Sequence, residues 1–221
     1  MEVKQIARKI IAMETGIAVS RQVRGELSDF DMRQMADAQF KHDNGRQWFT
    51  FHAHNLTPMT ILSKVQQTKA RYQLGRFVIL VDGIYCMELD EPDKRMSEVK
   101  KYGIIGRELQ QIARQVNAPI FATHQYNKEA YGRSKGRYLP YDGDLREGGE
   151  LKAAIDNLIL MYRPAKFYPE LEDDRENDVM MLMMDKARNQ PQAQNGRFYF
   201  RFDEKRGYSE AMKPEDFDKW L

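Results

Sequence analysis

The chain has 221 residues and a mass of 26.0 kDa, which is enough for one domain with a sizeable core and short for two. Its 35 basic and 33 acidic residues leave a net charge of +2, which excludes a histone-like binder but not a local nucleic-acid site. No apolar stretch approaches the roughly 20 residues that span a bilayer, and the single cysteine, Cys86, excludes an internal disulfide and predicts a cytoplasmic protein with no membrane partner.

The first half of the chain begins with helical patterns. Apolar residues recur at helical spacing over residues 3–13, and Ser28 is a suitable N-cap for a second amphipathic helix that reaches residue 40. Residues 48–53 alternate aromatic and polar side chains, which indicates a short strand. A threonine followed by proline predicts a helix over residues 57–74.

The middle of the chain alternates between strands and helices. The continuous apolar run 77–81 predicts a strand that is buried on both faces, and Asp82 ends it. A helix over residues 97–116 stops before a second buried strand at 120–123, and a polar loop follows over residues 127–144.

The C-terminal third predicts more strands. A short helix at 150–155 precedes strands at 158–162, 179–185 and 198–202, and the tail 214–221 fits one amphipathic turn. We therefore expect a single α/β domain over residues 1–221, with a mostly parallel sheet and antiparallel additions near the C-terminus.

Polar residues follow three of the expected strands. Asp82 ends the first, Gln125 follows the second, and Lys186 and Arg188 lie two residues apart at the end of a later strand. Ligands of open α/β sheets bind beyond the carboxyl ends of the strands, so these side chains are candidates for a phosphate site. The structural alternatives are a helix cap for the Asp, backbone bonding for the Gln, and solvation for the basic pair.

Four short segments, in this order and spacing, resemble the motor domain of DnaB-type replicative helicases, and the resemblance covers nearly all of residues 1–202. Residues 144–149 read Asp-Leu-Arg-Glu-Gly-Gly, close to the family's Asp-Leu-Arg-Glu-Ser-Gly. Residues 186–191 read Lys-Ala-Arg-Asn-Gln-Pro, close to its Lys-Asn-Arg-Asn-Gly-Pro. Residues 56–58 (Leu-Thr-Pro) and 125–128 (Gln-Tyr-Asn-Lys) match as well.

The resemblance implies a RecA-like P-loop NTPase sheet with helices on both faces, and an ATP-dependent helicase of DNA replication that works as a hexameric ring. The implied cofactors are ATP and Mg²⁺, and the implied partner is single-stranded DNA. The roles that the resemblance implies are a metal-associated carboxylate for Asp82, a γ-phosphate sensor for Gln125, a basic pair acting on the neighbouring subunit's ATP for Lys186 and Arg188, and a DNA-following loop for Arg146, Glu147 and Gly149.

The sequence departs from this family at the phosphate loop. No Gly-x-x-x-x-Gly-Lys-Ser/Thr occurs, and the glycine-rich residues 132–136 follow no strand. Met1 aligns with the last residue of the family's Ser-Leu-Glu-Met motif, so the catalytic Glu falls before the first residue and Glu2 does not replace it. We therefore expect a fold truncated before its first strand–loop–helix unit. Either a companion chain supplies the missing strand and phosphate loop, or the sheet closes around the gap, or the chain associates to cover it.

Four other interpretations stay open. One alternative is a DNA-binding or assembly module that has lost hydrolysis, and another is a related recombinase, against which residues 144–149 and 186–191 argue. The basic and aromatic side chains between Tyr126 and Tyr141 fit either single-stranded DNA or an ordinary surface loop. His52 and His54 form a weak zinc candidate without a third ligand.

Overall fold

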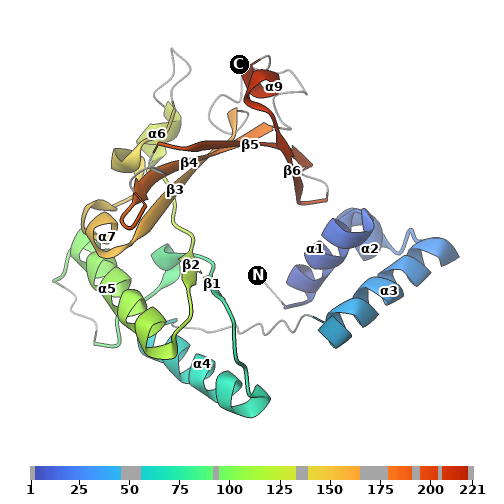
Figure 1. Cartoon of the computed structure of the whole chain (residues 1–221), viewed down its shortest axis with the longest axis horizontal. Coiled ribbons are helices and arrows are strands. Elements are labelled where there is room, and N and C mark those ends of the chain that lie inside the picture. Colours follow the sequence, from blue (N-terminus) through green and yellow to red (C-terminus); the bar gives the residue numbers. More distant parts are fainter. Residues whose placement is uncertain are drawn as a thin grey trace. The chain divides into compact units, whose positions relative to one another are not determined.

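The computed structural model describes residues 3–45, 56–91, 95–132, 139–164, 179–190, 195–203 and 206–218 (Figure 1). The chain forms two compact units, the first made of Met1–His52, Glu172–Met180 and Tyr199–Leu221, the second of Ala53–Leu171 and Met181–Phe198. The expected strand at 48–53, His52, His54 and the basic residues 133–137 lie outside the described residues. Among the described helices, none is both long and apolar enough to cross a bilayer.

The first unit contains helices α1 (Val3–Thr15), α2 (Val19–Arg24) and α3 (Asp29–Gly45). The N-cap expected at Ser28 is confirmed, because its Oγ accepts from the Asp31 backbone N at 3.1 Å. The Ser28 backbone N donates to the Asp31 carboxylate in return at 2.9 Å. This bond, a second one that the Ser28 hydroxyl donates to the carboxylate at 2.8 Å, and a 2.8 Å ion pair with Arg21 lower the pKa of Asp31. Helix α2, which the sequence reading missed, ends at Gly25 with a φ of +72°.

The same unit holds most of an antiparallel pair near the C-terminus. Strand β5 (Arg197–Asp203) pairs with β6 (Tyr208–Met212), with Tyr199 opposite Met212, and α9 (Pro214–Asp218) follows. The sequence predicted the first strand and the final turn but missed β6, a five-residue strand.

The second unit contains a parallel strand pair. Strand β1 (Ile79–Val81) pairs with β2 (Ile120–Ala122), and Val81 lies opposite Ala122. The parallel direction brings the residues that follow both strands to one edge. The short helix η1 (Ile84–Cys86) follows β1.

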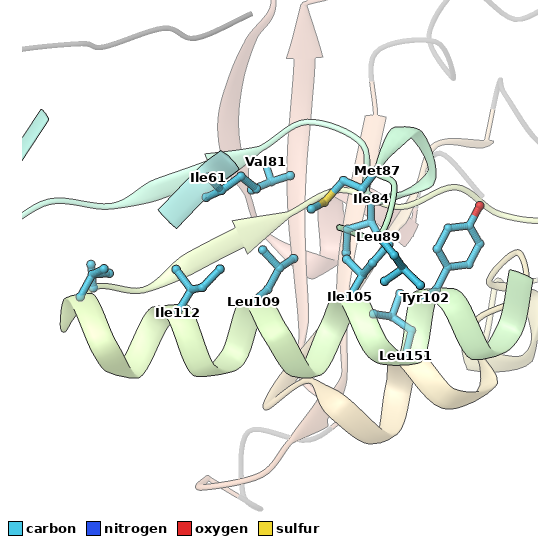
Figure 2. Packing of buried hydrophobic residues seen from close by; sticks show 12 residues of the cluster. Ile61, Val81, Ile84, Met87, Leu89, Tyr102, Ile105, Leu109, Ile112 and Leu151 are labelled. Atoms are coloured by element: carbon cyan, nitrogen blue, oxygen red, sulfur yellow. The ribbon is translucent and has the colours of Figure 1, made fainter. Parts of the chain in front are cut away.

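Two helices cover this strand pair and form the core (Figure 2). Helix α4 is Pro58–Tyr72, and α5 is Glu98–Val116, with Ser97 as its N-cap and Asn117 ending it in a left-handed conformation. Figure 2 shows the apolar face of α5 directed toward Val81, Ile84 and Met87. The buried cluster comprises Ile61, Val81, Ile84, Met87, Leu89, Tyr102, Ile105, Leu109, Ile112, Val116, Ala118 and Leu151.

Burial of these strands on both faces, which the apolar runs predicted, is wrong. Leu80 is 64% exposed and Phe121 is 57% exposed, whereas Val81 is buried. Alternate strand residues point to opposite faces, and the described core of this unit packs on only one of them. The opposite face therefore carries exposed apolar side chains. In the sequence these residues look the same as core residues, because both belong to one continuous apolar run.

An antiparallel pair completes the second unit. Strand β3 (Asn157–Tyr162) pairs with β4 (Val179–Ala187), with Leu158 opposite Lys186 and a register shift after Leu158. The segment between β2 and β3 contains the short elements α6 (Lys128–Gly132), η2 (Asp142–Asp144) and α7 (Gly149–Ala154). A parallel pair followed by antiparallel strands is the order that the sequence predicted.

The N-cap of α4 provides a stability prediction. Thr57 Oγ1 accepts from the Thr60 backbone N at 3.2 Å and donates to the Asp90 carboxylate at 2.5 Å. Thr57→Ala removes both bonds, so we expect the free energy of unfolding to fall by about 1–2 kcal/mol in urea titrations. Thr68→Ala, in the same helix but away from the cap, is the matched control, and we expect a change within about 0.5 kcal/mol. Equal losses for the two variants would refute the role of the cap.

Candidate functional site

Asp82 lies at the shared carboxyl edge of β1 and β2. Its side chain is exposed, and the Thr123 hydroxyl donates to Oδ1 at 3.0 Å. The next residue, Gly83, has a φ of +104°, and a Cβ there would lie 3.1 Å from the Tyr85 ring. A glycine is therefore required for the chain to turn away and leave the carboxylate accessible. A carboxylate so placed can hold a Mg²⁺-bound water.

Tyr85 lies in η1, directly after β1, and the sequence reading did not select it. The neighbouring Cys86 thiolate is the main cause that raises its pKa, burial adds to the rise, and Asp82 contributes. A side-chain hydrogen bond with Gln125 opposes this effect. Tyr85 thus has interactions with both Asp82 and Gln125, which supports the grouping of those two residues.

Gln125 is exposed and lies three residues after β2, in a segment that pairs with the predicted DNA loop. Its carbonyl accepts from the Arg146 backbone N at 3.0 Å, and Tyr126 forms an antiparallel bridge with Leu145. The Asn127 backbone N donates to the Asp144 carbonyl at 2.8 Å. Residues that are about twenty positions apart in the sequence are therefore joined by main-chain hydrogen bonds.

The predicted DNA loop is a tight turn that begins at two buried residues. Asp144 is fully buried and Leu145 is 9% exposed, whereas Arg146, Glu147 and Gly149 are exposed. The Gly148 backbone N donates to the Leu145 carbonyl at 3.2 Å, which closes the turn. The three residues predicted to contact DNA are thus the ones that point to solvent. A groove beside them is lined by Val99, Asn127, Lys128, Glu129, Gly143, Leu145, Glu147, Gly148 and Gly149.

His124 connects this turn to helix α5. Its Nε2 lies 2.6 Å from the Arg146 carbonyl oxygen, and its ring meets the Tyr102 ring edge-on with centroids 5.1 Å apart. Burial is the main cause that lowers the pKa of His124, the hydrogen bond with the Arg146 carbonyl opposes this shift, and the Arg146 charge adds to the lowering. The imidazole is therefore neutral at physiological pH.

Lys186 and Arg188 lie at the other end of helix α7. Lys186 Nζ donates to the carbonyls of Lys152 at 2.6 Å and Ile155 at 2.9 Å. Arg188 donates to the Ala153 carbonyl at 3.0 Å and to the Asp156 carboxylate at 2.8 Å. Two strand residues that are two positions apart should point to the same side, and both cations do reach the same end of α7. They are hydrogen-bonded to that end rather than simply solvated. Burial lowers the pKa of Lys186, and the charges of Arg188 and Lys152 add to this.

Lys152 and Asp156 are site residues that the sequence reading missed. Lys152 forms ion pairs with Asp142, which precedes the turn, and with Asp185 of β4 at 3.1 Å. Burial alone would lower the pKa of Lys152, but these two carboxylates outweigh it and raise the pKa. Asp156 also accepts from the Gln110 side chain at 3.0 Å. The sequence feature that could have pointed to Lys152 is that it is a lysine within a short helix whose other residues are mainly small or apolar.

Two glycines of α5 set the position of α7. A Cβ at Gly103 would lie 2.5 Å from the Glu150 Cβ, and one at Gly106 would lie 2.8 Å from the Leu151 Cδ1. Glycine is unfavourable inside helices, so a pair three residues apart was a readable sign of close helix contact. Helix α7 therefore joins the turn at its start to the basic pair at its end, and α5 supports it.

The donor set fits Mg²⁺ only in part. Within the described ranges, no three His, Cys, Asp or Glu side chains gather into a metal site. Asp82 alone fits a Mg²⁺ ion whose other ligands are water and nucleotide phosphates. The phosphate-binding loop that would hold those phosphates does not occur in the sequence.

Comparisons with known proteins show the family of the chain. The family model described as "DnaB-like helicase C terminal domain" matches residues 1–206. The chain is 27% identical over 192 residues to "Probable replicative DNA helicase" of Trieres chinensis, covering 86% of the chain and 41% of that protein. It is 27% identical over 189 residues to "Replicative DNA helicase DnaB" of Buchnera aphidicola, covering 85% and 39%. The chain thus spans about two-fifths of these relatives.

Solved structures show the same fold. A solved structure described as an ATPase domain superposes with a TM-score of 0.81 at 21% identity, covering 96% of this chain and 72% of that one. A DnaB-like replicative helicase, studied with its primase interactions, gives a TM-score of 0.80 at 21% identity, covering 96% and 49%.

Proposed function

The chain belongs to the DnaB-like helicase C-terminal domain family, and on this premise we propose that it is the ATP-dependent motor domain of a replicative DNA helicase. In this proposal residues 1–221 form one partial motor domain that works on single-stranded DNA within a hexameric ring. The cofactors are ATP and Mg²⁺, with Asp82 as the metal-associated carboxylate.

One observation carries the proposal: the segment of Gln125 is hydrogen-bonded to the turn of Arg146. A motor must link the state of its nucleotide to its hold on DNA. The proposed γ-phosphate sensor and the proposed DNA-contacting residue share a main-chain hydrogen bond, so a shift of one displaces the other.

Lys186 and Arg188 are proposed to act on the ATP of the neighbouring subunit. Two cations near a transferring phosphoryl group stabilise the charge that develops there. Among the described residues, these two side chains bind the carbonyls of Lys152, Ala153 and Ile155 and the Asp156 carboxylate, not Asp82 or Gln125 of their own chain. The lack of a bond between the basic pair and those two residues supports a role in trans.

Polypeptide outside residues 1–221 is proposed to supply the phosphate loop and its strand. Large apolar side chains of β1, β2 and β3 are exposed, among them Leu80, Phe121, Ile159 and Met161. Exposed apolar side chains on neighbouring strands favour coverage by further polypeptide. A non-catalytic DNA-binding module remains the second candidate, because the phosphate loop does not occur in these residues.

Nucleotide binding and hydrolysis separate the two candidates. We expect no DNA-stimulated ATP hydrolysis by the purified chain alone, since nothing in its sequence cradles the phosphates. With a companion segment that carries the phosphate loop, we expect micromolar Mg·ATP binding and hydrolysis that Asp82→Asn abolishes. Hydrolysis by the chain alone would overturn the companion proposal. No nucleotide binding in either case, with DNA binding retained, would favour the non-catalytic module.

A further inference from the structure

The turn that presents Arg146 has an unfavourable residue at its third position. It runs from Leu145 to Gly148 and is closed by the 3.2 Å hydrogen bond between them. Glu147, the third residue, has a φ of +50°. A positive φ at this position is characteristic of type II turns, which favour glycine or asparagine there. A glutamate is unfavourable in this conformation, so an interaction outside the turn has to hold it.

The peptide between Arg146 and Glu147 distinguishes the two common turn types. Between type I and type II, ψ of the second residue and φ of the third each change by roughly 150–170°. The central peptide therefore rotates by about half a turn, and its carbonyl oxygen moves to the opposite side. A group that binds the Arg146 carbonyl oxygen selects one of these two arrangements.

His124 is that group. A carbonyl oxygen only accepts hydrogen bonds, so at 2.6 Å the His124 Nε2 carries the proton and donates it. His124 Nδ1 is buried and has no hydrogen-bond partner among the described residues, which favours its unprotonated form. The edge-on contact with the buried Tyr102 fixes the ring, so the imidazole cannot follow a flipped peptide.

We propose that His124 is a positioning residue for the DNA loop: its neutral imidazole holds the Arg146–Glu147 peptide in the type II orientation. The Arg146 backbone N is held by the Gln125 carbonyl. Both main-chain polar groups of Arg146 are thus held by two consecutive residues of the sensor segment. Without the imidazole the turn relaxes toward type I, Glu147 regains a negative φ, and the Arg146 side chain changes direction.

A double-mutant cycle, measured in the unfolding equilibrium, tests without DNA whether His124 holds the turn. Glycine tolerates positive φ, so in a Glu147→Gly background the turn carries no strain that relaxation could recover. We expect His124→Ala to raise the unfolding equilibrium constant in both backgrounds, and at least about fivefold more in the Glu147→Gly background, because relaxation of the turn recovers the strain of Glu147 only in the natural one. Additive effects of the two substitutions would overturn the proposal. The nitrogen-15 shifts of the imidazole should also report the Nε2–H tautomer, and an Nδ1–H tautomer would contradict it.

A measurement of single-stranded DNA affinity tests how the His124 hydrogen bond affects DNA binding, and this experiment rests on the proposed function. With a fluorescent mixed-sequence oligonucleotide, we expect His124→Ala to weaken binding by roughly fivefold to thirtyfold, because only part of the population keeps the binding-competent turn. His124→Gln, whose amide nitrogen can donate to the same carbonyl, should recover most of the loss. A glutamine variant as weak as the alanine variant, with both folded by circular dichroism, would overturn the role of the donor.

A pH profile of the unfolding equilibrium tests whether the buried imidazole is neutral in the folded protein. The titratable groups that face His124 are Tyr102 and Arg146, and neither changes charge near pH 6. Because burial lowers the pKa of the folded His124, the unfolded state takes up a proton first as the pH falls, so the free energy of unfolding of the natural protein should fall below about pH 6.5 and that of His124→Gln should fall less. Identical pH profiles for the natural protein and His124→Gln would contradict the proposed state of the His124 imidazole. If no variant, the natural protein included, binds the oligonucleotide, the proposed function fails while the unfolding cycle still decides the role of His124.

Discussion

Replacing Arg146 with alanine is expected to weaken single-stranded DNA binding about tenfold, with similar losses on oligonucleotides of different sequence. The guanidinium is exposed on a turn whose main chain is fixed by His124 and Gln125. A fixed cation that contacts phosphate contributes to affinity without reading bases. Fluorescence anisotropy over a series of salt concentrations should show the salt slope reduced by about 0.7, which corresponds to one phosphate contact on a single strand.

Arg114→Ala is the matched control for this variant. Arg114 is also exposed, but it lies in the last turn of α5, twelve residues beyond the Tyr102 that contacts His124. At 1.5 Å per helical residue this places it about 18 Å further along the helix. We expect an unchanged affinity and salt slope for the control. Equal losses for both arginines would show diffuse electrostatic attraction, and no loss for Arg146→Ala would remove the DNA assignment of the turn.

Gly103→Val is expected to have the largest effect on stability outside the apolar core. A Cβ at this position would lie 2.5 Å from the Glu150 Cβ, so α5 and α7 must separate. Such overpacking lowers the free energy of unfolding by about 1–3 kcal/mol. Because α7 begins at Gly149, directly after the turn, we expect weaker DNA binding in the same variant at temperatures where it is still folded. Urea titration and anisotropy measure the two effects.

Gly75→Val provides the comparison for this substitution. No heavy atom lies within 4 Å of a Cβ built at Gly75, apart from its chain neighbours, and its φ is not positive. The same side chain added there should change the free energy of unfolding by less than about 0.5 kcal/mol. If Gly103→Val is as mild as Gly75→Val, the close approach of α5 and α7 does not constrain the site.

Much of the fold was predictable because it depends on local pattern. Helix α5 was expected over 97–116 and runs from Glu98 to Val116, since Ser97 caps it and its apolar residues repeat at helical spacing. Strand β4 was expected from residue 179 and does begin at Val179. Strand β6 was missed because its short sequence, Tyr-Ser-Glu-Ala-Met, carries no periodic signal, and its pairing with β5 defines it.

The sequence by itself determined the family, the order of most of the helices and strands, and the identity of the polar residues at the strand ends. These follow from residue types and spacing along the chain. Only the tertiary structure decided that His124 holds the Arg146 carbonyl, that Lys186 and Arg188 bind the end of α7, and that Gly103 admits α7 against α5. Each of these depends on contacts between residues distant in the sequence. A contact of that kind is fixed by packing and hydrogen-bond geometry, which have no local pattern to read.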